Sequence, residues 1–277
     1  MTETRKVLTI AGSDSGGGAG IQADVKTITL LGAYASTVVT AVTAQNTLGV
    51  QDIYAIPAGF VALQLESVLS DIRPHTIKTG MLCNAEIVHV VSERLRRYAK
   101  EVPLTLIVDP VMYSKSGSTL LEQRAQIVLK KELLPLATLV TPNLAETAEL
   151  SGIDVNSIGS MHEAAEVIYK LGPKNVLVKG GHLSIDAIDV LYDGRQFSEY
   201  FAPRIQTTHT HGTGCTFSAA IATFMAMGDD LPTAVAAAKE FISAAIETAS
   251  PIGGGIGSVN PYGALLSGDG EEVQPQP

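Results

Sequence analysis

The feature that most constrains the fold is a regular alternation of short apolar runs with longer amphipathic stretches between residues 58 and 181. Successive strands joined by a helix must run parallel, and each connecting helix lies on a face of the sheet. The pattern therefore predicts an α/β fold with three layers, α/β/α, around a mostly parallel central sheet. Strands are expected at 75–80, 104–110, 137–142 and 175–181, and helices at 58–71, 84–99, 120–134, 143–151 and 160–171.

The segments on either side extend this arrangement. Residues 186–202 predict two strands around an Asp193-Gly194 turn, which is a hairpin signal. No linker or repeat interrupts the pattern, so we expect one domain over residues 1–266 and a frayed polar tail over 267–277. The remaining expected strands cover 6–12, 35–46 and 50–56, and the remaining helices cover 21–32, 213–228 and 231–249.

Composition excludes several classes of partner. The net charge is −9 and no block of five basic residues occurs, so nucleic acid is not expected as a partner. The chain shows no signal peptide and no apolar stretch of membrane length, which favours a cytoplasmic protein without a membrane partner. The two cysteines, Cys83 and Cys215, give no disulfide framework.

A glycine-rich loop, "GSDSGGGAG", follows the first expected strand and precedes a helix. Gly18 and Gly20 with Ala23 fit the dinucleotide pattern G-x-G-x-x-A, but the next strand ends at Gln45 and offers no acidic residue for a ribose. No Gly-Lys-Ser or Gly-Lys-Thr closes a nucleotide phosphate loop. A turn that binds no ligand remains an alternative interpretation of this loop. We favour a ligand-binding loop, because ligands bind outside the carboxyl ends of such sheets.

A second glycine segment, "HGTGC", opens a long helix at residues 211–215. Backbone N–H groups at a helix start, freed by Gly212 and Gly214 beside Thr213, suit the charge of a transferring phosphoryl group. Cys215 falls in the first turn, where its thiol pKa is expected to be lowered. The alternative is a small buried cysteine. Cys83 has no such setting and is interpreted as packing.

These segments resemble the ribokinase-like superfamily, and within it the hydroxymethylpyrimidine and phosphomethylpyrimidine kinase family of thiamine biosynthesis. The resemblance rests on "LTIAGSDSGGGAGIQAD", "AVTAQNTLGV", "IKTGML", "VDPVM", "TPNLAE", "VKGGH" and "HGTGC", and covers about residues 6–262. It implies ATP-dependent phosphorylation of 4-amino-5-hydroxymethyl-2-methylpyrimidine to its monophosphate and then its diphosphate, in a stand-alone enzyme. Pyridoxine and pyridoxal kinases of the same superfamily are the alternative.

The resemblance places the first glycine loop at the acceptor substrate and makes Cys215 the catalytic base. Gln45 would pair with the ring nitrogen and the amine of the pyrimidine, since one carboxamide carries both a donor and an acceptor. A strand end that bonds only to backbone is the alternative for Gln45. Other residues expected around the pyrimidine are Gly12, Ala19, Asp24, Met81 and Val111, with Asp24 alternatively serving only its helix.

The resemblance also implies an ATP and Mg²⁺ site. Asp109 and Glu146 would hold magnesium, and Asn143 and Lys179 would contact ATP. Asn143 and Glu146 also fit a capping box at a helix start. Lys239 would flank the nucleotide or lie on a solvated helix face. Residues 112–117, "MYSKSG", are expected to form a lid with Gly117 as a hinge.

Two other classes of function stay open at this point. One is a protein that binds a pyrimidine without catalysis, and the other is a dinucleotide oxidoreductase that needs no magnesium. The superfamily resemblance further implies a homodimer.

Overall fold

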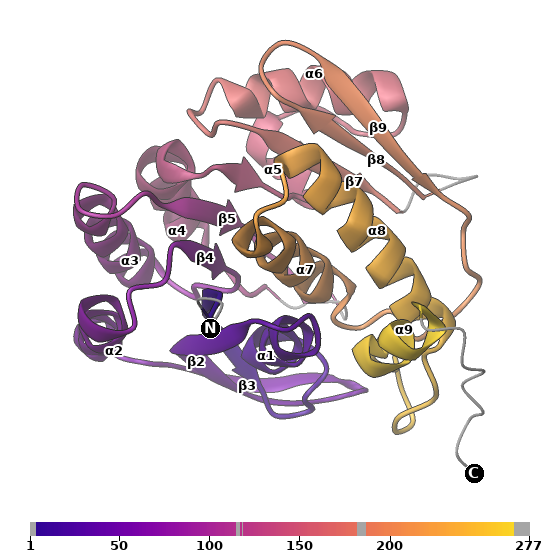
Figure 1. The fold of residues 1–277 in the computed structure, drawn as a ribbon, viewed down its shortest axis with the longest axis horizontal. Coiled ribbons are helices and arrows are strands. Elements are labelled where there is room, and N and C mark those ends of the chain that lie inside the picture. Colours follow the sequence, from indigo (N-terminus) through magenta and orange to yellow (C-terminus); the bar gives the residue numbers. More distant parts are fainter. Residues whose placement is uncertain (1–3, 115–116, 118, 182–186, 269–277) are drawn as a thin grey trace.

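The computed structural model describes residues 4–114, 117, 119–181 and 187–268. A nine-stranded sheet crosses its centre (Figure 1) in the order β3-β2-β1-β4-β5-β6-β7-β8-β9. Neighbours from β2 to β7 pair in parallel, while β3, β8 and β9 pair antiparallel at the two edges. The strands are β1 (Lys6–Asp14), β2 (Tyr34–Asn46), β3 (Gly49–Ala55), β4 (Thr76–Thr79), β5 (Thr105–Val108), β6 (Leu139–Val140), β7 (Val176–Gly180), β8 (Ala187–Tyr192) and β9 (Phe197–Ala202).

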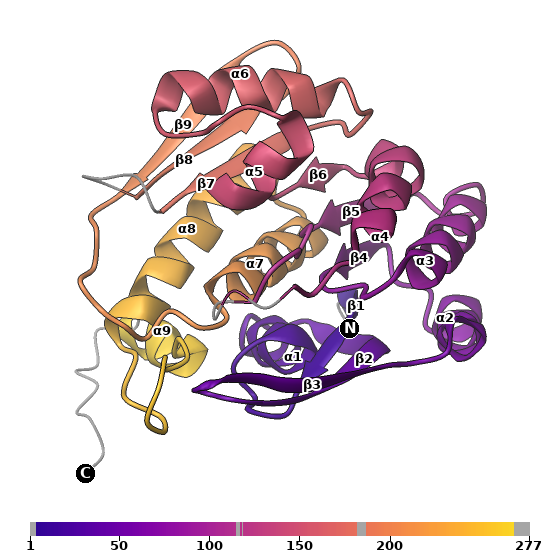
Figure 2. The ribbon, with the colours of Figure 1, turned by 180° about the vertical axis from the view of Figure 1, so that it is seen from behind.

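Helices cover both faces of this sheet, as Figures 1 and 2 show from opposite sides. One face buries a core that includes Leu65, Leu95 and Ile168. It carries α2 (Ala58–Asp71), α3 (Ala85–Tyr98), α4 (Gln123–Val128), α5 (Leu144–Ser151) and α6 (Ile158–Tyr169). The other buries Ile28 and Ile221 under α1 (Gly20–Leu30), α7 (Thr213–Met227), α8 (Leu231–Glu247) and α9 (Pro261–Gly268). The predicted three-layer α/β/α fold is confirmed.

The fold brings charged residues from several strand ends together at one edge of the sheet. Because β1, β4, β5 and β7 run parallel, their carboxyl ends meet at the same edge. Asp14 ends β1, Asp109 directly follows β5, and Lys179 lies one residue from the end of β7. The first turn of α7 begins at Thr213 beside these ends.

Two expected elements differ from those observed, and one observed helix has no expected counterpart. The strand expected at 6–12 continues to Asp14 after a register shift between Ala11 and Ser13, so the strand enters the glycine loop. The helix expected at 120–134 is α4 followed by a wide turn, Leu129–Leu133, and a tight turn, Leu134–Leu136, because Pro135 cannot continue an α-helix. Helix α9 was not expected at all.

Two expected mobile segments lie partly outside the described residues. In the expected lid, 115–116 are not described, and Met112 is fully buried in the core rather than part of a lid. The expected tail overlaps α9, which extends to Gly268, and 269–277 are not described. The expected hairpin is confirmed as β8 and β9, with Gly194 at φ +89° in the turn.

Candidate active site

A cavity of about 490 Å³ opens at the carboxyl edge of the sheet, between the two glycine segments. Its volume is in the range of small-molecule sites. The walls include all of the predicted site residues except Asp24: Gly12, Ala19, Gln45, Met81, Asp109, Val111, Asn143, Glu146, Lys179, Gly212, Thr213, Gly214, Cys215 and Lys239. Segments far apart in the sequence therefore meet at one site, as the resemblance implied.

The first glycine loop is folded around the carboxylate of Asp14. Its Oδ1 accepts a hydrogen bond from Gly16 N at 2.8 Å, and its Oδ2 accepts from Gly18 N at 3.1 Å and Ala19 N at 2.9 Å. Burial raises the pKa of Asp14, but the hydrogen bond from His211 and those from the backbone outweigh it and lower the pKa. Asp14 is therefore an anion that holds the loop closed.

The two glycine segments are pressed together at Gly212. This residue has φ +80°, a left-handed conformation that favours glycine, and it caps the N-terminus of α7. A Cβ at this position would overlap the carbonyl oxygen of Gly18. At Gly214 a Cβ would lie 3.2 Å from Lys179 Nζ and 3.6 Å from Asp109 Oδ2. Glycine thus brings the helix start into contact with both the loop and the charged cluster.

Gly212→Ala is expected to lower kcat by about 100-fold, because separating the loops misplaces the helix start by the order of an ångström. Steady-state kinetics with ATP and the acceptor would measure this. Gly59→Ala is the matched control, since Gly59 lies on α2 with open space around its Cα and no positive φ. Equal activity of Gly212→Ala and the wild type would contradict the role of this close approach.

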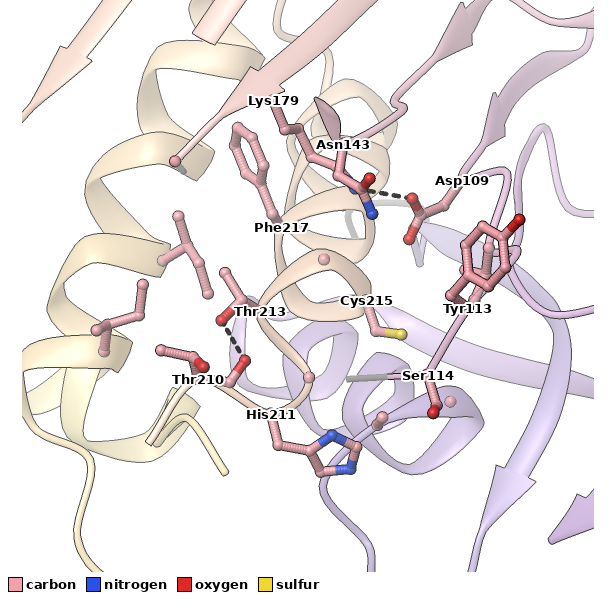
Figure 3. A pocket seen from close by; sticks show the side chains of 18 of the residues that line it. Asp109, Tyr113, Ser114, Asn143, Lys179, Thr210, His211, Thr213, Cys215 and Phe217 are labelled. Atoms are coloured by element: carbon pink, nitrogen blue, oxygen red, sulfur yellow. Dashed lines mark hydrogen bonds and ion pairs between the residues drawn. The ribbon is translucent and has the colours of Figure 1, made fainter. Parts of the chain in front are cut away.

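The thiol of Cys215 points into the cavity between Asp109 and His211 (Figure 3). The expectation of a lowered thiol pKa for Cys215 is wrong. Burial raises the pKa of Cys215 to about 11, while the positive charge of Lys78 opposes that rise and the charges of Asp24 and Asp109 add to it. The helix start therefore does not compensate for the loss of water around the sulfur. Cys83 packs against the core, as interpreted from the sequence.

A buried charged cluster that includes Lys179 and Asp109 lines the cavity (Figure 3). Lys179 Nζ lies 2.8 Å from Asp109 Oδ1, and Asp109 is 2% exposed. Burial raises the pKa of Asp109, but Lys179 and Lys78 outweigh it and hold the pKa below its usual range. Ser218 and Thr141 also donate to Asp109, each at 3.3 Å. Asp109 is thus ionised.

Glu146 joins this cluster through a helix cap. Asn143 and Glu146 form a capping box at the start of α5, with Glu146 N donating to Asn143 Oδ1 at 3.0 Å and Asn143 N donating to Glu146 Oε2 at 2.9 Å. Both side chains also line the cavity, so the two interpretations of this motif hold together. Burial raises the pKa of Glu146 to about 7, Lys179 lowers it, and Asp109 raises it further.

Two predicted site residues, Asp24 and Lys239, are held in buried ion pairs. Asp24 is fully buried, accepts hydrogen bonds from Lys78 Nζ at 2.8 and 2.9 Å and from Thr9 at 2.5 Å, and so has no carboxylate oxygen facing a ligand. Lys239 lies in the cavity wall, but its Nζ is 2.6 Å from Asp189 Oδ2, and it is only 7% exposed. The alternative interpretation, in which Lys239 lies on a solvated face of its helix, is therefore wrong.

Sequence reasoning missed three residues of this region: Asp14, Lys78 and His211. Asp14 and His211 both lie inside quoted motifs, yet only their contact across the two loops reveals a role. Lys78 is a charged residue inside the apolar strand "HTIKTG", and this break in the pattern was the available signal. A buried lysine requires a partner, which is Asp24.

A glycine-lined helix start, a lysine and two carboxylates around an acceptor cavity define, on this fold, a phosphotransferase of the ribokinase-like class. A family model described as phosphomethylpyrimidine kinase matches residues 14–260. The chain belongs to this family. It is 48% identical over 259 residues to a hydroxymethylpyrimidine/phosphomethylpyrimidine kinase of Streptomyces coelicolor, covering 94% of this chain and 95% of that protein.

Two further comparisons bear on the range of the family. A thiamine biosynthesis bifunctional protein of Geobacter sulfurreducens is 52% identical over 255 residues, which are 92% of this chain, and the chain spans about half (51%) of that longer protein. The pyridoxal kinase of Staphylococcus aureus, solved with AMP-PCP and pyridoxal, superposes with a TM-score of 0.86 at 37% identity, covering 95% of this chain and 94% of that one. The fold is therefore shared with kinases of two different rings.

Among the described residues, no helix combines the length and the apolar character needed to cross a membrane.

Proposed function

We propose that this chain is an ATP-dependent kinase that phosphorylates 4-amino-5-hydroxymethyl-2-methylpyrimidine to the monophosphate and then to the diphosphate. The observation that carries the proposal is the meeting of Gln45, Cys215 and the Lys179–Asp109 pair in one cavity. Gln45 suits an aminopyrimidine edge, and the α7 start suits a phosphoryl group. The relatives named for both kinase activities support the same two steps.

In this proposal each residue has one task. Gln45 holds the ring, while Met81 and Gly12 lie close together in the acceptor wall, with a Cβ at Gly12 falling 3.0 Å from the Met81 sulfur. Cys215 takes the proton of the hydroxymethyl oxygen as that oxygen bonds to the γ-phosphorus and ADP leaves. The N–H groups of Gly212 and Gly214, on either side of Thr213 at this helix start, stabilise charge on the transferring group. Lys179 neutralises ATP phosphate oxygens.

The residues present fit a magnesium ion. Asp109 and Glu146 are both buried at the cavity wall, and the charge of Asp109 raises the pKa of Glu146, which indicates that the two carboxylates gain from a shared cation. Mg²⁺ is commonly held by one or two carboxylates with substrate phosphates and water. Among the described residues no group of three or more His, Cys, Asp and Glu side chains is arranged so that it could hold a metal ion. When bound, the ion would neutralise phosphate charge.

The magnesium requirement is expected to depend on pH through Glu146. Its pKa of about 7 means that protons compete with the cation below pH 7. The carboxylate fraction rises about tenfold between pH 6 and pH 8, so apparent magnesium affinity should rise by about tenfold over the same range. Magnesium titrations of activity at both pH values measure this.

Glu146→Gln should weaken magnesium and flatten this dependence. Glu149→Gln, an exposed change on the same helix, should retain it. A wild-type affinity that falls as pH rises from 6 to 8 would contradict the assignment of Glu146.

The proposal is tested by supplying ATP and Mg²⁺ with the hydroxymethylpyrimidine, with pyridoxal and with pyridoxine in separate reactions, and by following products by mass spectrometry. A monophosphate that is converted to the diphosphate supports the two-step kinase. Phosphorylation of only the pyridoxine and pyridoxal rings would move the function to vitamin B6, the alternative that the resemblance to pyridoxal kinase structures favours. If none of the three acceptors leads to ADP formation, both the pyrimidine kinase and the vitamin B6 kinase are contradicted.

The same proposal includes one kinase domain over residues 1–266, a homodimer and a cytoplasmic location. One continuous sheet spanning β3 to β9 supports the single domain. Sedimentation equilibrium of the purified chain would test the dimer.

A further inference from the structure

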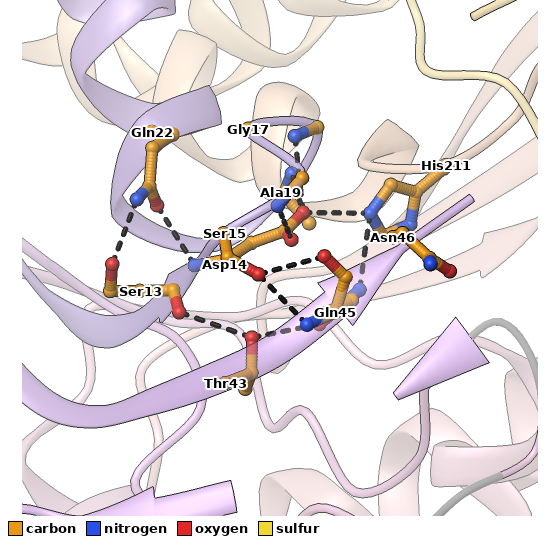
Figure 4. A network of polar contacts seen from close by, with 12 residues as sticks. Ser13, Asp14, Ser15, Gly17, Ala19, Gln22, Thr43, Gln45, Asn46 and His211 are labelled. Atoms are coloured by element: carbon orange, nitrogen blue, oxygen red, sulfur yellow. Dashed lines mark hydrogen bonds and ion pairs between the residues drawn. The ribbon is translucent and has the colours of Figure 1, made fainter. Parts of the chain in front are cut away.

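His211 links the two glycine segments to the pyrimidine reader Gln45 (Figure 4). Its Nε2 lies 2.9 Å from Asp14 Oδ2, and the two side chains are only 14% and 4% exposed. Its backbone is fixed as well, since His211 N donates to Gly257 O at 3.0 Å and Val259 N donates to His211 O at 3.1 Å. The imidazole therefore has little freedom to turn.

The proton on this imidazole nitrogen has a defined place. Asp14 is an ionised carboxylate that accepts three backbone N–H groups, and it can only accept from His211. The hydrogen must therefore sit on Nε2 of His211. A protonated ring nitrogen has no lone pair, so it cannot accept a hydrogen bond from a second donor.

Gln45 meets this nitrogen with its amide. Gln45 Nε2 is placed 3.3 Å from His211 Nε2, which would set two donors against each other. At the other end, Thr43 Oγ1 lies 3.1 Å from Gln45 Oε1 and also 3.1 Å from Ser13 O. The single hydroxyl proton satisfies Ser13, and the hydroxyl oxygen is then an acceptor. Both neighbours favour the amide turned by 180°, with its nitrogen toward Thr43 and its oxygen toward His211, whose single Nε2–H then donates mainly to Asp14 and is shared with Gln45.

We propose that His211, held by Asp14, is a positioning residue that fixes the order in which Gln45 presents its acceptor and its donor, and thereby selects the ring. The inference rests on the proposed function of Gln45 as the pyrimidine reader. An aminopyrimidine shows a ring acceptor beside an amine donor. Its 4-oxo analogue shows a ring N–H donor beside a carbonyl acceptor. A fixed amide matches the first edge and rejects the second, whereas an amide free to turn matches both.

The experiment compares kcat/KM for the hydroxymethyl aminopyrimidine and for its 4-oxo analogue, with ATP and Mg²⁺, in the full chain. The wild type should favour the amino ring by about 100-fold or more, because a mismatched pair leaves buried polar groups without partners. His211→Leu removes the donor, and the ratio should fall to within about fivefold. His211→Gln carries an amide N–H of similar reach and should restore most of the preference.

His89→Leu is the matched control. His89 also pairs with a carboxylate, Glu132 at 2.7 Å, but on the exposed surface of α3. It should leave the ratio unchanged. Thermal melting of each variant reports folding, and Asp14→Asn provides a second route if His211→Leu does not fold, since it replaces a carboxylate that can only accept by an amide that can also donate, and the proton of His211 is then no longer fixed on Nε2. The ratio should fall in Asp14→Asn as well.

Two results would overturn the inference. One is a His211→Leu or Asp14→Asn protein that loses activity toward both rings by the same factor, which is the behaviour of a residue with a purely structural role. The other is a wild type without preference. Turnover of neither ring by the wild type would contradict the proposed function instead. In that case calorimetry measures the affinity of the same variants for the two rings. The ratio of the two affinities then tests the orientation of the Gln45 amide.

Discussion

Replacing Cys215 by alanine is expected to slow phosphorylation of the hydroxymethyl group by about 10²–10⁴-fold, the usual contribution of a positioned general base. Phosphorylation of the monophosphate should fall by less than about tenfold, because its attacking phosphate oxygen is already ionised and needs no base. Separate initial rates for the two acceptors measure both effects. Equal losses in the two steps would count against Cys215 as the base.

The raised pKa of the Cys215 thiol also predicts in which direction the rate of the first step changes with pH. With a pKa of about 11 for Cys215, the thiolate fraction at neutral pH is small and grows with every step upward in pH. The first step should therefore accelerate by up to about tenfold per pH unit between pH 7 and 9, while the second should not. Alkylation of Cys215 by iodoacetamide in the free protein should follow the same slope. A first-step rate that declines with rising pH would point to a different base.

Lys78→Met is expected to destabilise the fold by about 3–5 kcal/mol, because the Asp24 carboxyl, whose pKa burial already raises, loses its cationic partner in the interior. Both side chains are fully buried, and the ion pair at 2.8 Å joins β4 to α1 directly beneath the site. The midpoint of urea unfolding measures the change. A smaller loss, below about 1 kcal/mol, would show that the pair carries little of the stability.

The double variant Lys78→Met/Asp24→Leu separates the cost of an unpaired charge from the loss of the pair itself. Replacing a buried pair by apolar residues is often close to neutral, so most of the stability should return. Lys100→Met, an exposed change, should shift stability by less than about 0.5 kcal/mol. The double variant removes both the positive charge of Lys78, which lowers the pKa of Cys215, and the negative charge of Asp24, which raises it. Because these two effects oppose each other, the pH dependence of the first step should change little.

Much of the architecture was predictable from local pattern. Alternating strands and helices gave the parallel sheet, and Asp193-Gly194 gave the hairpin at its edge. The boundaries that failed depend on context. β1 runs on to Asp14 because its neighbour β2 continues the pairing past the register shift, and α9 forms against α8 and α1, which local propensity does not register. Pro135 was a visible signal for the broken helix after α4.

The sequence by itself determined the fold class, the family and the residues that gather at the site, since glycines, a helix start and strand-end polar residues are local features. Only the tertiary structure decided the pKa values and the ion-pair partners of these residues. Burial, which depends on every surrounding element, raised the pKa of Cys215 where the helix start predicted a lowered one. It also closed Asp24 off behind Lys78, and it joined Asp14 to His211 across 197 residues. Partners this distant in the chain meet only when the whole sheet is assembled.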